Sequence, residues 1–157
     1  MAVTVESVWD YPRPPALDPS TERVVVSHRG QVLVDSTSTV RVLETSHPPT
    51  YYIPFSDVDF SYFEQVQGST WCEFKGEATY ADIVVEGDRV PRVAWWYENP
   101  TPGFVTLKDH LALYPGRVDD VTVDGEVVQA QEGDFYGGWI TSRVTGPFKG
   151  APGTLGW

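Results

Sequence analysis

Short stretches in which apolar and polar residues alternate recur along most of the chain. Valine-rich stretches cover residues 24–27, 31–36 and 39–44, and a turn at residues 28–30 separates the first two. Alternation with a period of two places every second side chain on one face of a strand, and β-branched residues favour strands. These stretches predict a β-hairpin followed by a third strand. A further half-buried strand is expected at residues 57–62, where the apolar positions are Val58, Phe60 and Tyr62.

Two more hairpins are expected in the second half of the chain. Residues 80–97 contain two apolar runs around a polar turn at residues 86–88. In residues 121–130, Asp124 and Gly125 stand between valine-rich arms, and this pair favours a tight turn with positive φ values. The chain is therefore expected to contain many short antiparallel strands.

One segment has helical spacing instead. Leu107, His110, Leu111 and Tyr114 recur as on one side of a helix, which predicts about two helical turns, although residues 111–114 also fit the start of a strand. The overall prediction is a mainly β fold: a compact antiparallel sheet domain with at most one or two short helices.

The chain of 157 residues has the size of one ordinary domain. Residues 1–20 are rich in proline and lack a hydrophobic period, so they are expected to form an extended arm. Trp9 and Tyr11 are expected to hold this arm on the domain or on a partner subunit. Residues 21–145 are expected to form the β domain, and residues 146–157 a tail rich in glycine and proline.

Charge and composition narrow the classes of partner. The chain has 22 acidic and 11 basic residues, a net charge of −11, and its basic residues are scattered. A nucleic-acid partner is not expected, because such a chain repels the phosphate backbone. No membrane association is expected either, since no apolar run reaches the length of a membrane span. A single cysteine and the absence of a secretion signal at the N-terminus indicate a cytoplasmic protein.

The densest group of reactive side chains follows the strand at residues 39–44. Glu44 and His47 stand there next to the double proline Pro48 and Pro49, which stiffens the backbone into a bend. His47 is a candidate base, oriented by Glu44 or by a tyrosine. The alternatives are a histidine that only holds the bend in place, and a glutamate that is a solvated strand end or part of an ion pair.

A second group contains the only cysteine. Cys72 is a candidate nucleophile, and Lys75 is a candidate to activate it or to stabilise negative charge. Residues three apart on a strand point to opposite faces, so the pair meets only if the chain turns sharply, which Gly76 permits. The alternative for Cys72 is a small buried hydrophobic residue. Glu44, His47 and Cys72 are possible metal ligands, but because the sequence has neither a Cys-x-x-Cys pair nor a His-x-x-x-His pair, no metal and no cofactor is predicted.

Several aromatic residues are candidates for the wall of a ligand pocket. In a strand, Trp95 and Tyr97 share one face and Trp96 takes the other. Core packing is the alternative explanation for all of these rings. The ligand-binding candidates are Arg41, Tyr51, Tyr52, Tyr80, Trp95 and Tyr97.

Four motifs in order resemble one known family. They are RVLETSHPPTYYIP at residues 41–54, the pattern Cys-x-x-Lys-Gly-x-Ala-x-Tyr at 72–80, AWWY at 94–97 and LALYPGRVD at 111–119. This series resembles the domain-of-unknown-function family 427, which is catalogued as nucleotidyltransferase-like. The arm and the tail resemble those of the longer, actinobacterial-type members.

The resemblance implies a compact β fold related to the β-tent architecture of Mss4-like proteins. Their paired Cys-x-x-Cys zinc knuckles are not present in this chain. Nucleotidyl transfer is not expected, because it requires paired acidic residues for magnesium and a Gly-Ser loop, and this pattern does not occur.

Three functions are consistent with these residues. The first is a small-molecule enzyme in which Cys72 or Lys75 acts as nucleophile or electrostatic stabiliser and His47 with Glu44 moves protons. The second is a binding module in which an aromatic cage holds a small ligand without chemistry. The third is an interaction protein that uses the aromatic N-terminal arm, for example to form a homodimer.

Overall fold

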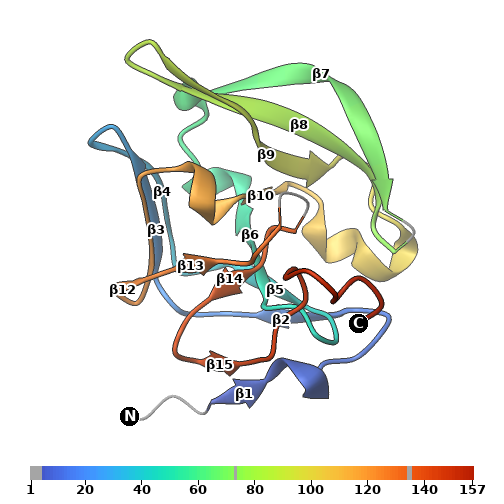
Figure 1. Ribbon diagram of the computed structural model, residues 1–157. Coiled ribbons are helices and arrows are strands. Elements are labelled where there is room, and N and C mark those ends of the chain that lie inside the picture. Colours follow the sequence, from blue (N-terminus) through green and yellow to red (C-terminus); the bar gives the residue numbers. More distant parts are fainter. Residues whose placement is uncertain (1–4, 73, 134–135) are drawn as a thin grey trace.

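Two antiparallel β-sheets face each other in the computed structural model, which describes residues 5–72, 74–133 and 136–157 (Figure 1). In spatial order, the seven-stranded sheet consists of β2 (Ala16–Pro19), β5 (Val40–Leu43), β6 (Thr50–Pro54), β10 (His110–Leu113), β9 (Asp88–Tyr97), β8 (Gly76–Val85) and β7 (Phe63–Cys72). The four-stranded sheet consists of β12 (Glu126–Val127), β11 (Asp120–Val123), β3 (Val24–His28) and β4 (Gln31–Ser36). The mainly β, antiparallel fold is as predicted.

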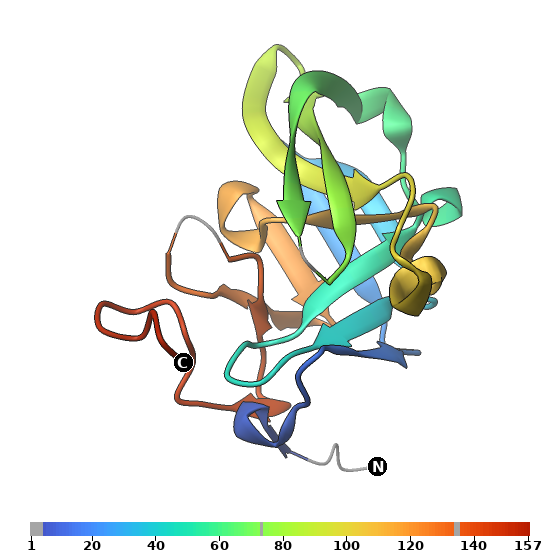
Figure 2. The same cartoon turned by 90° about the vertical axis from the view of Figure 1, so that its right-hand side faces the viewer.

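Smaller elements complete the fold. Two short pairs of strands are the parallel pair β1 (Glu6–Ser7) with β15 (Val144–Thr145) and the antiparallel pair β13 (Gln129–Ala130) with β14 (Trp139–Ile140). The short 3₁₀ helices are η1 (Val8–Asp10), η2 (Phe55–Asp57), η3 (Phe60–Tyr62), η4 (Pro102–Leu107) and η5 (Pro115–Arg117). Figure 2 shows β7, β8 and β9 curving over one end of the molecule, while the N-terminal segment and β15 lie at the opposite end.

The main core lies between the two sheets. Val24 and Val26 of β3 point into it, together with Leu111 and Leu113 of β10, and all four are fully buried. Each pair is spaced by two residues, as the alternation of valines and leucines in the sequence predicts. The three hairpins expected at residues 24–36, 80–97 and 121–130 are all present as antiparallel pairs.

The other face of the seven-stranded sheet carries a second cluster. Val40, Val42 and Ala112 belong to it, and η4 contributes Phe104 and Leu107. The seven-stranded sheet is thus covered by apolar side chains on both faces over its central strands, which makes it the middle layer of the molecule.

The N-terminal segment lies on the domain. Strand β1 pairs with β15 and β2 pairs with β5. Tyr11 is buried, and the indole of Trp9 donates a hydrogen bond of 2.7 Å to the carbonyl of Pro147. Trp9 also packs edge-on against Trp157 at 5.4 Å between ring centroids, so the two ends of the chain contact each other.

A buried ionic network joins this segment to the sheet. Arg41 is only 1% exposed, and its guanidinium donates to both carboxylate oxygens of Glu6, at 3.0 and 3.2 Å, and to Asp18. Glu6 also accepts from the Tyr11 hydroxyl at 2.6 Å and from Arg143 at 3.3 Å. Burial by itself raises the pKa of Glu6, but its hydrogen bonds to Arg41 and Tyr11 bring this pKa below its usual value. The network therefore holds Glu6 in its charged form.

Two predicted elements are wrong. The helix expected at residues 107–114 is absent: η4 ends at Leu107, Asp109 adopts a positive φ of 58°, and β10 pairs with β6 and β9. Hydrogen bonding on both edges of β10 overrides the helical spacing of its leucines.

The strand expected at residues 57–62 is also absent. Only Val58 forms an isolated bridge, to Val34. Asp59 instead accepts hydrogen bonds from the amide and the hydroxyl of Ser61, at 3.1 and 2.6 Å, and so caps η3. This local capping competes with strand pairing and turns the chain into β7.

The ionic network yields a prediction about stability. Arg41→Ala removes the cation between Glu6 and Asp18 and is expected to lower the free energy of unfolding by about 2–4 kcal/mol. Urea denaturation followed by far-UV circular dichroism measures the change. Arg23→Ala is the matched control, because Arg23 forms a similar pair with Asp35 on the surface and should have little effect. Equally small losses in the two variants would contradict a structural role for the network.

Candidate functional site

Four of the predicted aromatic candidates lie together on one face of the seven-stranded sheet. Tyr80 and Trp95 are direct neighbours on β8 and β9, and Tyr97 is paired with Ala78 in the same ladder. Tyr52 of β6 packs in the same cluster. We call these residues, Tyr52, Tyr80, Trp95 and Tyr97, the aromatic face. Trp96 packs into the opposite core, so the prediction that it points away from its two neighbours is confirmed.

A hydrogen bond joins two members of the aromatic face. The indole nitrogen of Trp95 donates to the hydroxyl of Tyr52 at 3.2 Å, and the rings of Tyr52 and Tyr97 lie 6.3 Å apart between centroids. Burial raises the pKa of both tyrosines above the usual value. Their hydroxyls therefore stay protonated near neutral pH and are available as hydrogen-bond donors.

Cys72 and Lys75 stand at the turn between β7 and β8, beside the aromatic face. The sharp turn that the sequence required is present: Cys72 pairs with Gly76, which has a φ of 109°. Thr101 stabilises the turn with two hydrogen bonds. Its amide donates to the backbone carbonyl of Lys75 at 3.1 Å, and its hydroxyl donates to the backbone carbonyl of Phe74. Cys72 is half-buried against the aromatic cluster.

His47 is held between two side chains in the loop between β5 and β6. Its Nε2 lies 3.5 Å from a carboxylate oxygen of Glu44, and its Nδ1 lies 3.2 Å from the amide nitrogen of Gln131. The orientation of the Gln131 amide follows from its other partners: its oxygen accepts from the amide of Gly138, and its nitrogen donates to the carbonyl of Lys149. Nδ1 is therefore an acceptor, which leaves the imidazole proton on Nε2, directed at Glu44.

Burial keeps the imidazole of His47 neutral at physiological pH. Burial is the main cause that lowers its pKa, to about 4; the charge of Glu44 opposes this shift, and the positive charges of Lys149, Arg13 and Lys75 add to it. The charge of Lys75 has the smallest of these effects on the pKa of His47, and it also opposes the rise that burial causes in the pKa of Tyr97.

The C-terminal third of the chain supplies residues that the sequence reasoning missed. The ring of Tyr136 packs edge-on against His47 at 5.1 Å, and the Lys149 ammonium lies 5.6 Å from the centre of that ring. A Cβ atom at Gly137 would lie only 2.4 Å from the ring of Trp95, so the backbone passes directly over the indole. The Gly137–Gly138 pair between aromatic residues was the available signal, because glycine permits such a close approach.

Two ligand-binding candidates lie elsewhere. Arg41 belongs to the ionic network described above. Tyr51 points to the opposite side of β6, where it stacks on Trp139 at 4.8 Å and donates a hydrogen bond of 3.0 Å to Glu22. Both side chains are 1% exposed, so the structure does not bring them to the aromatic face.

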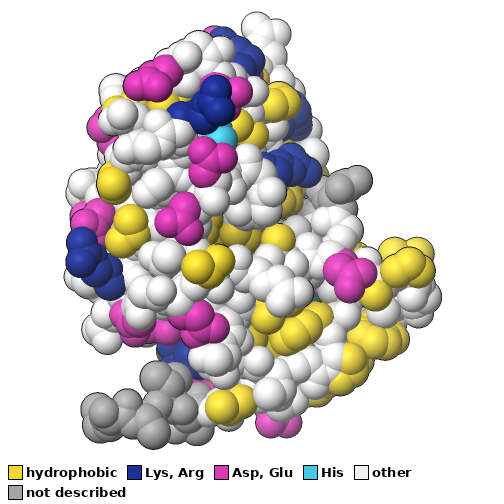
Figure 3. All heavy atoms as spheres, turned by 60° about the vertical axis from the view of Figure 1, so that its left-hand side comes forward, with side chains coloured by type: hydrophobic (Ala, Val, Ile, Leu, Met, Phe, Trp, Pro, Cys, Tyr) yellow, Lys and Arg dark blue, Asp and Glu magenta, His cyan; other side chains and the backbone are white. Residues whose placement is uncertain are grey.

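No group of three or more His, Cys, Asp and Glu side chains is placed to hold a metal ion within residues 5–72, 74–133 and 136–157. In that same part of the chain, none of the helices is long and apolar enough to cross a membrane. Figure 3 shows acidic side chains spread over the height of one face of the molecule, with basic side chains beside them.

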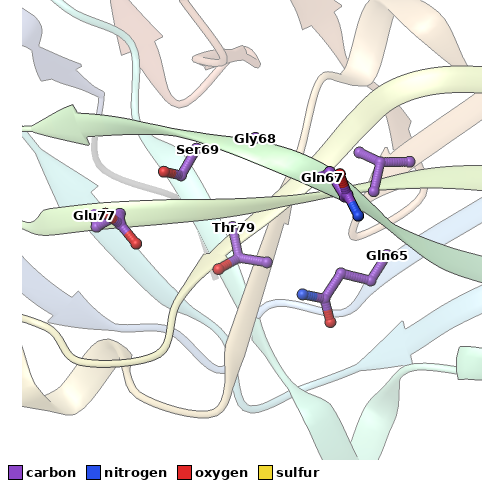
Figure 4. Close-up of a pocket in the computed structure, with 7 residues that line it drawn as sticks. Gln65, Gln67, Gly68, Ser69, Glu77 and Thr79 are labelled. Atoms are coloured by element: carbon purple, nitrogen blue, oxygen red, sulfur yellow. The ribbon is translucent and has the colours of Figure 1, made fainter.

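A separate hollow of about 400 Å³ lies on the hairpin of β7 and β8 (Figure 4). Ser69 and Thr79 line it and are cross-strand partners. Tyr80, the next residue after Thr79, points to the aromatic face. Because successive side chains of a strand point to opposite sides, the hollow and the aromatic face lie on opposite faces of the hairpin.

The environment of His47 predicts a pH dependence of stability. Its pKa is about 4 in the folded chain and about 6.5 in the unfolded chain, so the unfolded state binds the proton first as the pH falls below 6.5. The contribution of neutral His47 to the free energy of unfolding is fully present above pH 6.5 and is lost as the pH falls towards 4. Between about pH 7 and pH 5 the loss is expected to be about 2 kcal/mol.

Comparing urea denaturation of His47→Gln with the parent protein measures this contribution. The variant should lose less stability over the same pH interval, whereas His110→Gln, a change in the more exposed His110, should keep the parent's pH dependence. A His47→Gln variant with an unchanged pH dependence would contradict the buried, neutral imidazole.

Comparison with known protein families gives one match. The model of a domain of unknown function, DUF427, matches residues 16–124, which is more than half of the chain. This range includes Glu44, His47, Cys72 and Lys75, while Gln131 and Lys149 lie beyond it. No curated protein matches the sequence. The chain belongs to the DUF427 family, as its four motifs indicated.

Proposed function

We propose that this protein is a small-molecule enzyme whose reaction takes place between the aromatic face and the loop that holds His47. The observation that supports this proposal is the segment at Tyr136 and Gly137, which connects the two regions: the ring of Tyr136 packs against His47 at 5.1 Å, and the backbone at Gly137 passes directly over the ring of Trp95. In the proposed site, a thiol, an ammonium group, an imidazole and two neutral phenols serve one substrate. Groups of this kind supply a nucleophile, charge stabilisation and proton transfer.

Each residue has a role in the proposed reaction. Cys72 or Lys75 attacks or polarises the substrate, and the ammonium of Lys75 stabilises negative charge that develops beside it. His47 accepts a proton at Nδ1, which then loses the hydrogen bond from Gln131, and Glu44 at Nε2 stabilises the imidazolium that results. The nearby cations Lys149 and Arg13 favour a substrate that carries a negative charge.

The enzyme proposal is tested by following consumption of small molecules. The purified protein is incubated with a protein-free cell extract, and mass spectrometry identifies the compound that disappears. Cys72→Ala and His47→Ala are each expected to reduce its consumption by about a hundredfold or more. Lys75→Met should slow it, whereas Lys108→Met, at an exposed lysine, should not. If both the Cys72 and the His47 variants consume the compound at the parent's rate, the proposed mechanism is wrong.

A non-catalytic binding module is the second candidate. The observation in its favour is that both ring nitrogens of His47 already have partners, Glu44 and Gln131, so the ring serves to order the loop. The ligand would then lie against the rings of the aromatic face, of which Tyr80 is partly exposed.

The binding module predicts a ligand without turnover. A compound from the same extract should raise the melting temperature of the protein and be recovered unchanged. Tyr80→Ala should abolish the shift, and Tyr62→Ala, at a tyrosine of similar exposure outside the aromatic face, should preserve it. Recovery of a chemically altered compound would exclude this alternative and support the enzyme.

We also propose that the fold is related to the β-tent architecture of Mss4-like proteins, that the chain is of the actinobacterial type, and that it acts in the cytoplasm. The sequence motifs support the first two statements. The single, half-buried cysteine supports the third, since disulfides are rare in reducing compartments.

A further inference from the structure

Polar side chains, most of them uncharged, make up the larger part of the lining of the hollow on the hairpin of β7 and β8. Its lining residues are Gln65, Val66, Gln67, Gly68, Ser69, Glu77 and Thr79. Figure 4 shows the polar side chains gathered along the two strands. Because positions 65 to 71 of a strand span about 20 Å, the polar strip is long enough for several linked rings.

The polar side chains of this hollow have no partners among the residues that the structure describes. Over the described part of the chain, the side chains of Gln65, Gln67, Ser69, Glu77 and Thr79 form no hydrogen bond or ion pair. Two amides, two hydroxyls and one carboxylate therefore present both donors and acceptors to a ligand.

Trp71 extends the same surface at one end. It is the cross-strand partner of Glu77, so both side chains point to the side of the hairpin on which the hollow lies. Its side chain is 71% exposed, although burial of an indole is strongly favourable. On the next strand, Trp96 is the partner of Thr79 and is half-buried against Phe55. Aromatic rings thus border the polar strip.

A bulge in β7 shapes the hollow. The register of β7 and β8 shifts between Val66 and Ser69, and Gly68 has a positive φ of 98°. Arg92 reaches across from β9 and donates to the carbonyl of Gln67 at 3.4 Å. The bulge therefore bends the strand and adds curvature to a surface that would otherwise be flat.

From these observations we propose that this surface, which we call the hairpin groove (Gln65, Gln67, Ser69, Trp71, Glu77 and Thr79), binds a neutral oligosaccharide. Amides, hydroxyls and a carboxylate match the paired hydroxyl groups of sugars, which both donate and accept hydrogen bonds. The exposed indole of Trp71 packs on the apolar face of a sugar ring. No cation lines the hollow, and the chain has a net charge of −11, so a phosphorylated or sulfated ligand is disfavoured.

The site is independent of the proposed enzyme, because the hairpin groove and the aromatic face lie on opposite sides of β7 and β8. Loss of either activity therefore leaves the other measurable in the same full-length protein.

Titration calorimetry with cellohexaose, maltohexaose and chitohexaose tests the proposal, with a sulfated heparin hexasaccharide as the charged comparison. At least one neutral hexasaccharide is expected to bind with a dissociation constant of about 1 mM or tighter, and the sulfated one is not. Trp71→Ala and Gln67→Ala should each weaken binding about tenfold or more. Leu155→Ala and Gln129→Ala are the matched controls, because they remove an exposed apolar side chain and an exposed glutamine elsewhere.

Three results would overturn the proposal. The first is absence of binding for all three neutral hexasaccharides. The second is binding that the Trp71 and Gln67 variants leave unchanged. The third, from analytical ultracentrifugation, is a homodimer that dissociates in Trp71→Ala, which would assign the exposed hairpin to self-association instead. Circular dichroism of each variant verifies that a loss of binding does not reflect unfolding.

Discussion

The alternation of side chains across the seven-stranded sheet is the constraint on which the rest of the structure depends. On β8, Ala78 and Tyr80 belong to the aromatic cluster, while Ala81 and Ile83 pack into the core between the sheets. Neighbouring residues are thus assigned to different environments by backbone geometry alone. The same rule separates the aromatic face from the hairpin groove, so one hairpin serves two surfaces without a shared side chain.

Residues distant in sequence are held around this sheet by polar contacts. Arg41 joins the N-terminal segment to β5, and Gln131 orders His47 through an amide whose two ends have fixed partners. Such groups are costly to bury unless every partner is in place, so they define one arrangement of the loops. The candidate site consequently combines the DUF427 region with a C-terminal segment outside it, and Lys149 and Gln131 belong to that segment.

Local signals predicted the hairpins well and the connecting segments poorly. Asp124 and Gly125 specify their turn by themselves, since few other residues adopt positive φ readily. The leucines of β10, in contrast, fit a helix or a strand equally, and the choice depended on the two strands that flank them. At residues 57–62 the alternating pattern was real, but capping by Asp59 outweighed strand pairing. Competition of this kind between local and long-range hydrogen bonds is not visible in a hydrophobic pattern.

By itself the sequence determined the mainly β class, the family, and the division of Trp95, Trp96 and Tyr97 between two faces, because periodicity, turn residues and motif order are properties of neighbouring positions. Tertiary structure decided which reactive groups meet. It placed Arg41 and Tyr51 in the interior, packed Tyr136 against His47, and added Gln131 to the site. The reason is physical: the proximity of residues far apart in the chain depends on how strands pair and loops pack, and these interactions exist only once the chain has folded.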